Sequence, residues 1–457
     1  MQIIDYVIVI GTVPFIWYWA RQGVTRKNTT LHIVLYGFFL HFILSIVRWQ
    51  LTPWYIALVL VAVIEVIARA RLTTPNKRLV NVVYGLTALS VLAMIALPVY
   101  PMPQPSGPFT IGTYSQIITN PERTEQYGSR QGELRAFKVQ YWYPAQTTQG
   151  AEQTKWIADG VPVTRSLTRD WSLPFFLLDH ITSYESSAYL NAPPVEDIAL
   201  LPIAIISHGW SSTRTLHTDL AEELASQGYF VIGMEHTYGS LATVLGDEEE
   251  DIQYLYTEAL PPRAQTPNYL EFANLLVETY ASDIIAAIDV LEGLNQAPGA
   301  FNQRLDLTSI HVIGHSTGGG AAVKAAMDDE RITSVVGMDA WVEPLTQADL
   351  NAGLTTRALY LRSNGWETGE NNEFLYQLLQ NSSNASPLYQ IDGTTHYDFA
   401  MVYMYSPLTR AIGITGTIDA SYVNQMLETI VLEFLTTTEP YQIDTTEWPE
   451  VRIIPIS

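Results

Sequence analysis

The sequence predicts an α/β fold, in which a mostly parallel sheet has helices on both faces, preceded by an N-terminal region of four transmembrane helices. Of the 457 residues, 47% are hydrophobic and 15% are charged, a composition typical of folded domains rather than of disordered chains. The charge changes sign at Tyr100, because the first hundred residues have a net charge of +6 and the remainder has −28. Beyond Tyr100, short apolar runs alternate with helical patterns, which favours a parallel sheet covered on both faces.

Composition also excludes several classes of function. The formal net charge is −22, and a chain that binds the phosphate backbone normally has the opposite sign, so we expect no nucleic-acid partner. The chain has no cysteine, which excludes disulfide scaffolds, thiol catalysis and cysteine-ligated metal centres. It also has no His-Glu-x-x-His motif and no glycine-rich phosphate-binding loop. We therefore expect neither a metal centre nor an organic cofactor.

Four apolar stretches occupy residues 1–100. They are Ile3–Ala20, Leu31–Val47, Trp54–Ala68 and Leu79–Tyr100. The hydrocarbon core of a bilayer requires about 20 helical residues, with a range of roughly 17–25. The second and fourth stretches meet this length outright, and the first and third are borderline. Tryptophans at the ends of the stretches favour the membrane interface, so we expect a multi-pass transmembrane region with the lipid bilayer as its partner.

The loops between these stretches predict the orientation. Basic residues are concentrated in the first and third loops, at Arg21, Arg26, Lys27, Arg69, Arg71, Lys77 and Arg78. The second loop has only Arg48. The positive-inside rule then puts the first and third loops in the cytoplasm. We expect an integral protein of the plasma membrane, with a Pro-rich linker at 101–108 and a domain at 109–457 on the extracytoplasmic side.

From residue 109 onward, strands and helices alternate along the chain. Strand patterns lie at Leu134–Tyr143, Ile203–Ile206, Phe230–Met234, Ile310–Ile313, Val335–Met338, Arg357–Leu361 and Leu388–Ile391. Helical spacing covers Leu216–Gln227, Leu270–Leu294, a small-residue segment from Gly318, and Tyr422–Leu435. This alternation indicates successive strand–helix–strand units in one sheet.

The strongest chemical signal is Gly314-His315-Ser316-Thr317-Gly318, between a buried strand and a Gly/Ala-rich helix. A serine at a sharp strand-to-helix turn has strained backbone angles, and Gly314 and Gly318 on either side leave room for it. The positive end of the following helix favours a developing oxyanion. The motif therefore predicts Ser316 as a nucleophile at an elbow of the α/β-hydrolase type.

A second motif, Ser207-His208-Gly209-Trp210, ends an earlier strand. In α/β-hydrolases the oxyanion hole consists of the amide after the nucleophile and one from the loop after the third strand. These would be the backbone amides of Thr317 and Trp210.

A serine hydroxyl needs a base, and in this fold the acid and then the histidine follow the serine along the chain. His396 is the only histidine after Ser316, so it is the predicted base. The spacing leaves the acid open, since Asp339 ends the next strand and Glu367 follows the one after. Asp392 lies close to His396 in the chain, but a hydrogen bond across the ring would be awkward there.

Three segments resemble a known family: Ile313–Gly320 (IGHSTGGG), Met338–Leu345 (MDAWVEPL) and His396–Phe399 (HYDF). They are similar to the plasma-type, group VII platelet-activating-factor acetylhydrolases of the α/β-hydrolase superfamily. The resemblance covers most of Gly107–Leu435 and none of the membrane region. It implies that Asp339, in the Asp-Ala-Trp motif, is the acid of a Ser316–His396–Asp339 triad.

Two positions depart from the family pattern: Thr317, where an aromatic residue is common, and Glu343, where an apolar residue is usual. The expected function is a membrane-anchored serine ester hydrolase, and the resemblance implies phospholipids with a short or oxidised acyl chain at the second position. A general short-chain carboxylesterase or a polyester-type hydrolase is the alternative among enzymes. A non-catalytic membrane sensor or binding module is the alternative from another class. The sequence predicts no oligomeric state.

Overall fold

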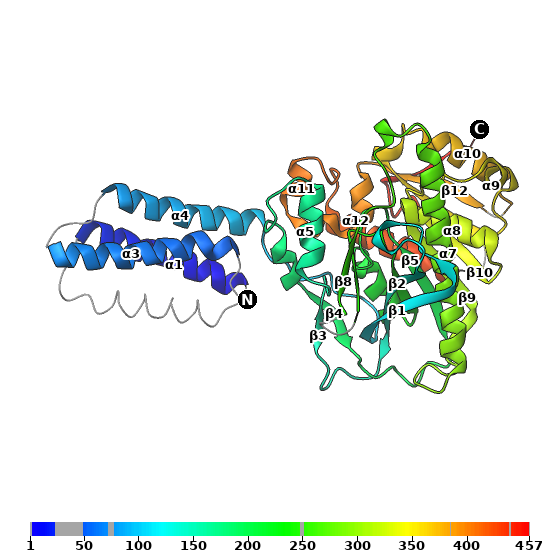
Figure 1. Ribbon diagram of the computed structural model, residues 1–457, viewed down its shortest axis with the longest axis horizontal. Helices are drawn as coiled ribbons and strands as arrows, with labels where there is room; N and C mark the ends of the chain where they lie inside the picture. Colours follow the sequence, from blue (N-terminus) through cyan, green and yellow to red (C-terminus); the bar gives the residue numbers. More distant parts are fainter. Residues whose placement is uncertain are drawn as a thin grey trace.

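The computed structural model describes residues 2–22, 49–71, 77–246, 251–383, 385–437 and 440–456. Its N-terminal part contains helices and its remainder is built around one large sheet (Figure 1). The N-terminal elements are α1 (Gln2–Gln22), the 3₁₀ turn η1 (Trp49–Leu51), α3 (Thr52–Arg71) and α4 (Lys77–Ala96).

Three of the four apolar stretches therefore coincide with helices, and the second, Leu31–Val47, lies outside the described residues. Within the described part of the chain, α4 is the one helix whose length and apolar composition suffice to cross a bilayer. The apolar part of the preceding helical segment, Trp49–Ile64, is shorter than this criterion requires. A four-helix transmembrane region thus stays a prediction.

The large sheet has eleven strands in the order β13-β12-β11-β10-β9-β5-β6-β2-β1-β4-β3. The strands are β1 (Thr110–Thr124), β2 (Leu134–Ala145), β3 (Gln153–Lys155), β4 (Glu185–Leu190), β5 (Leu201–Ser207), β6 (Phe230–Glu235), β9 (Leu305–His315), β10 (Ile332–Met338), β11 (Arg357–Ser363), β12 (Ala385–Ile391) and β13 (Val451–Ile454). The run from β12 to β6 is parallel, whereas β13 and β2 pair antiparallel at its two sides. The prediction of a mostly parallel sheet is confirmed. A separate hairpin consists of β7 (Ala242–Leu245) and β8 (Gln253–Tyr256).

Helices cover both faces of this sheet (Figure 1). The helices of the α/β domain are α5 (Val161–Asp170), α6 (Thr218–Ser226), α7 (Tyr269–Gln296), α8 (Thr317–Asp328), α9 (Gln347–Ala352), α10 (Asn371–Asn381), α11 (Leu408–Ala411) and α12 (Ala420–Thr436). Successive side chains of β5 alternate between two cores, as the period of a strand requires. Ile203 and Ile205 pack with α7 and α8, whereas Ala204 and Ile206 pack with α6 and α12. Each buried Ile or Leu stabilises the fold by about 1.5–3 kcal/mol.

The segment that joins α4 to the α/β domain packs closely against that domain. Met102 is 3% exposed and belongs to an apolar cluster with residues of α5 and of the segment after residue 399. The Ser106 amide and hydroxyl both donate to the Glu223 carboxylate at 2.6 Å. Gly107 lies so close to α6 that a Cβ on it would be 2.2 Å from the Ser226 carbonyl oxygen. The Pro-rich stretch at 101–108 is therefore fastened along its length.

Candidate active site

Ser316 lies at the turn between β9 and α8, with φ of 57° and ψ of −120°. A residue other than glycine in this region carries about 1–3 kcal/mol of strain. Two backbone hydrogen bonds hold the turn, from the Ser316 amide to Met338 O and from the Trp341 amide to Ser316 O. The serine is partly exposed, and its hydroxyl makes no hydrogen bond within the described residues. It is thus accessible to a ligand.

The two glycines of the motif are required by close backbone contacts. A Cβ on Gly314 would lie 2.1 Å from the Gly318 carbonyl oxygen, and a Cβ on Gly318 would lie 2.1 Å from Ser207 O. Real Cβ atoms do not approach oxygen so closely, so the elbow excludes any side chain at either position. These contacts also bring the end of β5 against the first turn of α8.

His396 and Asp339 meet beside this turn. His396 Nδ1 lies 2.9 Å from Asp339 Oδ2, and a carboxylate accepts hydrogen bonds, so Nδ1 carries the proton. Nε2 of the neutral ring is then the free basic nitrogen. Asp339 is 2% exposed, and it accepts two further hydrogen bonds, from the Ser363 amide at 2.7 Å and the Ser363 hydroxyl at 2.6 Å. These bonds orient the carboxylate toward the imidazole.

The two other acids considered from the sequence bind elsewhere. Glu367 and Asp392 both form ion pairs with Arg452 at 2.9 Å, at the surface of the domain. The structure therefore brings Asp339, and neither of these two, to His396.

Two aromatic side chains that sequence reasoning missed pack against His396. The indole of Trp366 stacks on the imidazole at 4.5 Å between ring centroids, with 7° between the planes. His315, inside the serine motif, lies 4.4 Å away and donates from Nε2 to His396 O at 3.1 Å. Burial lowers the pKa of His315 well below its usual value, and the nearby His396 lowers it further. No spacing rule indicates Trp366, whereas His315 adjoins a predicted nucleophile.

Gly209 and Trp210 form the loop after β5, next to the serine. A Cβ on Gly209 would lie 3.0 Å from Ser316 Cβ. The Trp210 amide makes no hydrogen bond within the described ranges. The amide of Thr317, the first residue of α8, has no partner inside the helix. In the part of the chain that the structure describes, neither predicted oxyanion donor has a backbone acceptor, and the α8 dipole adds positive potential at the Thr317 amide.

Behind this loop lies a second serine–histidine–aspartate arrangement that sequence reasoning missed. Ser207 Oγ is 2.9 Å from His236 Nε2, and His236 Nδ1 is 3.0 Å from Asp283 Oδ2. All three residues are fully buried. Burial raises the pKa of Asp283, but the Arg135 guanidinium, which binds both carboxylate oxygens, and the His236 imidazole hold it well below its usual range. This network fastens the end of β5 to β6 and α7.

Glu343, which departs from the family pattern, is buried and pairs with a half-exposed arginine. Its carboxylate pairs with both terminal nitrogens of Arg263, at 2.7 and 3.0 Å. It also accepts from Trp341 Nε1 at 3.1 Å. The charge is thereby neutralised within a segment whose Trp341 amide bonds to Ser316 O.

Comparison with known proteins decides the family. Residues 94–452 match the family model described as "Platelet-activating factor acetylhydrolase, isoform II". The chain belongs to this family. The acetylhydrolase match begins within α4 and includes Ser316, Asp339 and His396. The resemblance inferred from the sequence motifs is confirmed.

Individual relatives of this acetylhydrolase-family chain are distant. The platelet-activating factor acetylhydrolase of Canis lupus familiaris is 22% identical over 283 residues, which cover 57% of this chain and 62% of the relative. A "putative phospholipase A2" of Schizosaccharomyces pombe is 27% identical over 208 residues, which cover 42% of this chain and 46% of the relative. The chain thus matches less than two thirds of the length of these curated relatives.

A solved structure supports the fold. The ferulic acid esterase from Streptomyces cinnamoneus aligns with a TM-score of 0.59 at 19% identity, over 77% of this chain and 98% of the esterase. The acetylhydrolase-family chain therefore has an α/β-hydrolase-like fold, as predicted.

Proposed function

We propose that this chain is a membrane-anchored serine ester hydrolase in which Ser316 is the nucleophile, His396 the base and Asp339 the acid. One observation carries the proposal. The imidazole of His396 is bonded through Nδ1 to the buried Asp339 carboxylate at 2.9 Å, beside a serine held at a strained elbow. This combination makes a serine hydroxyl nucleophilic.

In the proposed reaction, His396 Nε2 takes the proton of Ser316 as Oγ attacks the ester carbonyl. The amides of Trp210 and Thr317 donate to the oxyanion of the tetrahedral intermediate. His396 then returns the proton to the leaving alcohol, and an acyl-enzyme remains on Ser316. Water activated by His396 hydrolyses the acyl-enzyme, while Asp339 keeps the imidazole in the required tautomer and stabilises its charged form.

The proposed substrate class is a phospholipid ester with a short or oxidised acyl chain at the second position. Family membership supports it, as do the printed names of the relatives. The surface beside the site is also apolar. Tyr397 is 43% exposed, and its ring centroid lies 6.4 Å from that of Trp171. Phe176, five residues after Trp171, contacts Trp49 of η1. An apolar surface therefore extends from the site toward the membrane region.

Membrane anchoring is part of the same proposal. On α4, Leu92 is 62% exposed and Ile95 is 55% exposed, which suits a lipid environment rather than water. We place the α/β domain on the extracytoplasmic side of the plasma membrane, in accordance with the basic loops. Anchoring would present lipid esters to Ser316 at a high local concentration.

The test uses the full chain in lipid nanodiscs, with Ser316→Ala and, as a matched control, Ser383→Ala, which changes an exposed serine. Hydrolysis is followed for 4-nitrophenyl acetate, butyrate and octanoate and for a phosphocholine lipid with an acetyl group at the second position. We expect Ser316→Ala to lower kcat by about 10⁴ or more, with the control unchanged.

The substrate series separates the alternatives. A strong preference for the acetyl phospholipid supports the acetylhydrolase function. Equal turnover of all short esters indicates a general carboxylesterase instead. If the folded wild type and Ser316→Ala hydrolyse every ester equally slowly, the enzyme proposal fails and a binding module takes its place.

A further inference from the structure

The carboxyl end of α4 is capped by side chains of the α/β domain and of η1. The last carbonyls of a helix have no partner inside it and need hydrogen-bond donors from outside. Ser406 Oγ donates to Ala96 O at 2.5 Å, and Gln50 Nε2 donates to Leu97 O at 2.9 Å. The Tyr184 hydroxyl lies 2.8 Å from Pro98 O. The bonds from Ser406 and Tyr184 fix the end of the helix to the domain.

Two of these capping groups also hold the segment that contains His396. This segment comprises the 3₁₀ turns η6 (His396–Phe399) and η7 (Met401–Tyr405), followed directly by Ser406. The Tyr184 hydroxyl shares its proton between Pro98 O and Met404 O, the latter at 3.0 Å. The helix end and the histidine segment are thus bonded to the same side chain.

Apolar packing follows the same path. Met401, Met404 and Tyr405 are each at most 5% exposed and belong to one cluster with Met102. The partly buried Leu97, at the end of α4, packs against that cluster. The junction, which is the segment from Ala96 to Gly107 that joins α4 to the α/β domain, therefore supplies one wall of the core on which the histidine segment rests.

A row of aromatic rings extends from the junction to the residue after His396. Tyr184 stacks on Trp156 with 5.7 Å between the ring centroids, and the Trp156 centroid lies 5.9 Å from that of Tyr405. Trp171 contacts Tyr405 at 6.0 Å and Tyr397 at 6.4 Å. Tyr397 directly follows the predicted base in the chain. A continuous row of packed rings therefore connects the end of α4 with the residue that follows His396.

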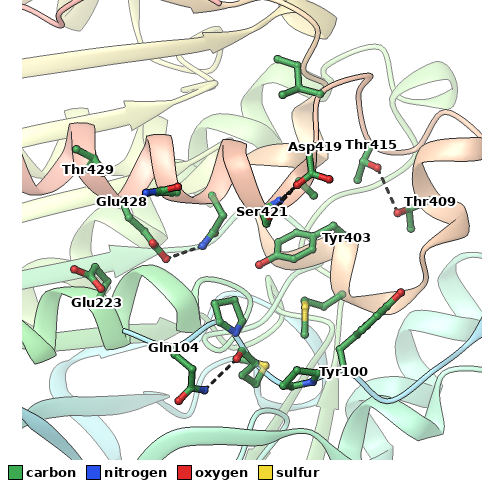
Figure 2. Close-up of a pocket in the computed structure, with 18 of the residues that line it drawn as sticks. Tyr100, Gln104, Glu223, Tyr403, Thr409, Thr415, Asp419, Ser421, Glu428 and Thr429 are labelled. Atoms are coloured by element: carbon green, nitrogen blue, oxygen red, sulfur yellow. Dashed lines mark hydrogen bonds between the residues drawn. The ribbon is translucent and has the colours of Figure 1, made fainter. Parts of the chain in front are cut away.

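On another side, the same segment borders open space. A cavity of about 940 Å³ lies between the junction and the histidine segment, with Tyr100 and Gln104 on one wall and Tyr403 on another. Figure 2 shows Tyr403 extending between these junction residues and the carboxylates of Glu223 and Glu428. The cavity borders Tyr403 on this side of the segment, and the bonds to the end of α4 and the aromatic row support the segment elsewhere.

We propose that Tyr184 and Ser406 are positioning residues for His396, and that the end of α4 takes part in holding the base in place. The proposal rests on the ester hydrolysis proposed above. Neither side chain lies among the groups that touch substrate. A displacement of about 1 Å at a catalytic group lowers the rate by up to about a hundredfold, so a modest loosening of the segment is measurable.

The test compares full-length wild type in nanodiscs with Tyr184→Phe, Ser406→Ala and the double variant. Tyr189→Phe is the matched control, because Tyr189 lies on β4, the strand that directly follows Tyr184, is half-buried and makes no hydrogen bond from its hydroxyl within the described residues. The substrate is 4-nitrophenyl acetate, whose solubility in water removes membrane access from the measurement. Active serines are counted by titration with a fluorophosphonate, and kcat per titrated serine is recorded from pH 5 to 9.

We expect the double variant to lose about tenfold in kcat per titrated serine at unchanged KM, with a displaced midpoint in the acid limb of its pH profile. That limb reports the catalytic base, and a mere loss of folded protein changes neither quantity. Unchanged kcat per serine and an unchanged midpoint in both single variants overturn the proposal, even if the double variant does not fold. If wild type shows no turnover above Ser316→Ala, the proposed function itself fails, which is a distinct result.

Discussion

Replacing Asp339 by asparagine should abolish most of the activity without disturbing the fold. The Asp339 carboxylate accepts three hydrogen bonds, from the Ser363 amide to Oδ1 and from the Ser363 hydroxyl and His396 Nδ1 to Oδ2. The Ser363 amide cannot turn, so the asparagine oxygen must take the Oδ1 position. The opposite orientation would set two buried donors against each other, at a cost of about 1–3 kcal/mol.

The asparagine NH₂ group then faces His396 Nδ1. That nitrogen must accept rather than donate, so the proton of the neutral imidazole moves to Nε2, which can no longer take the proton of Ser316. A wrong tautomer of this kind lowers kcat by about 10⁴ in a serine triad, equivalent to about 5 kcal/mol of transition-state stabilisation. The Ser363 hydroxyl can rotate to accept from the new amide, which preserves the local structure.

The assay is kcat for 4-nitrophenyl acetate in nanodiscs, with the unfolding midpoint measured in parallel. Asp392→Asn is the control, since Asp392 is paired with Arg452 at the surface, and it should stay within about twofold of wild type. An Asp339→Asn protein that retains more than a tenth of wild-type kcat would refute the assignment of the acid.

Three further outcomes follow from the structure. Trp366→Ala should lower kcat by up to about tenfold through loss of the stack on His396, worth about 0.5–1.5 kcal/mol, and Trp366→Phe should restore part of it; equal rates for both variants and wild type contradict a positioning role. Asp283→Asn should destabilise the fold by about 3–5 kcal/mol in urea unfolding, because Arg123 and Arg135 lose their shared buried partner and Glu125 alone stays paired with Arg135; a change below 1 kcal/mol contradicts this. Burial, with Asp219 and Glu223 nearby, raises the pKa of Glu428 to about 8, so the folded state holds a proton that the unfolded state releases, and stability falls as pH rises from about 5 to 8. Glu428→Gln should therefore raise the unfolding temperature at pH 8 more than at pH 5, and an equal shift at both pH values argues against the raised pKa.

The central strands could be predicted because each is buried on both faces and forms a continuous apolar run. The predicted runs at Ile203–Ile206 and Val335–Met338 lie inside β5 and β10. Strand β1 escaped prediction, since it alternates irregularly between exposed and buried positions and contains Pro121. The edge strands β3 and β13 have three and four residues, too short for a pattern.

The site residues also fall into two groups. Some could be predicted from neighbouring residues in the sequence, and others are brought together only by contacts between distant parts of the chain. The serine turn could be predicted because its glycines and serine are contiguous, and backbone crowding at the elbow restricts those positions. The acid could not be derived from spacing, since Asp339 and Glu367 both follow strands. What separates them is the approach of His396, which comes 57 residues after Asp339. Trp366 contacts the base for the same long-range reason.

The His396–Asp339 and His236–Asp283 pairs of this chain have nearly identical distances, 2.9 and 3.0 Å. A geometric template for hydrolase triads would return Ser207–His236–Asp283, because this set has both the serine–histidine and the histidine–aspartate contact. A fluorophosphonate needs room to place its phosphorus beside the attacking oxygen, and Ser207 is fully buried. Chemical labelling should therefore mark Ser316 alone. In this molecule, solvent access distinguishes a reactive serine from a structural one, and annotation of related sequences by triad geometry should include it.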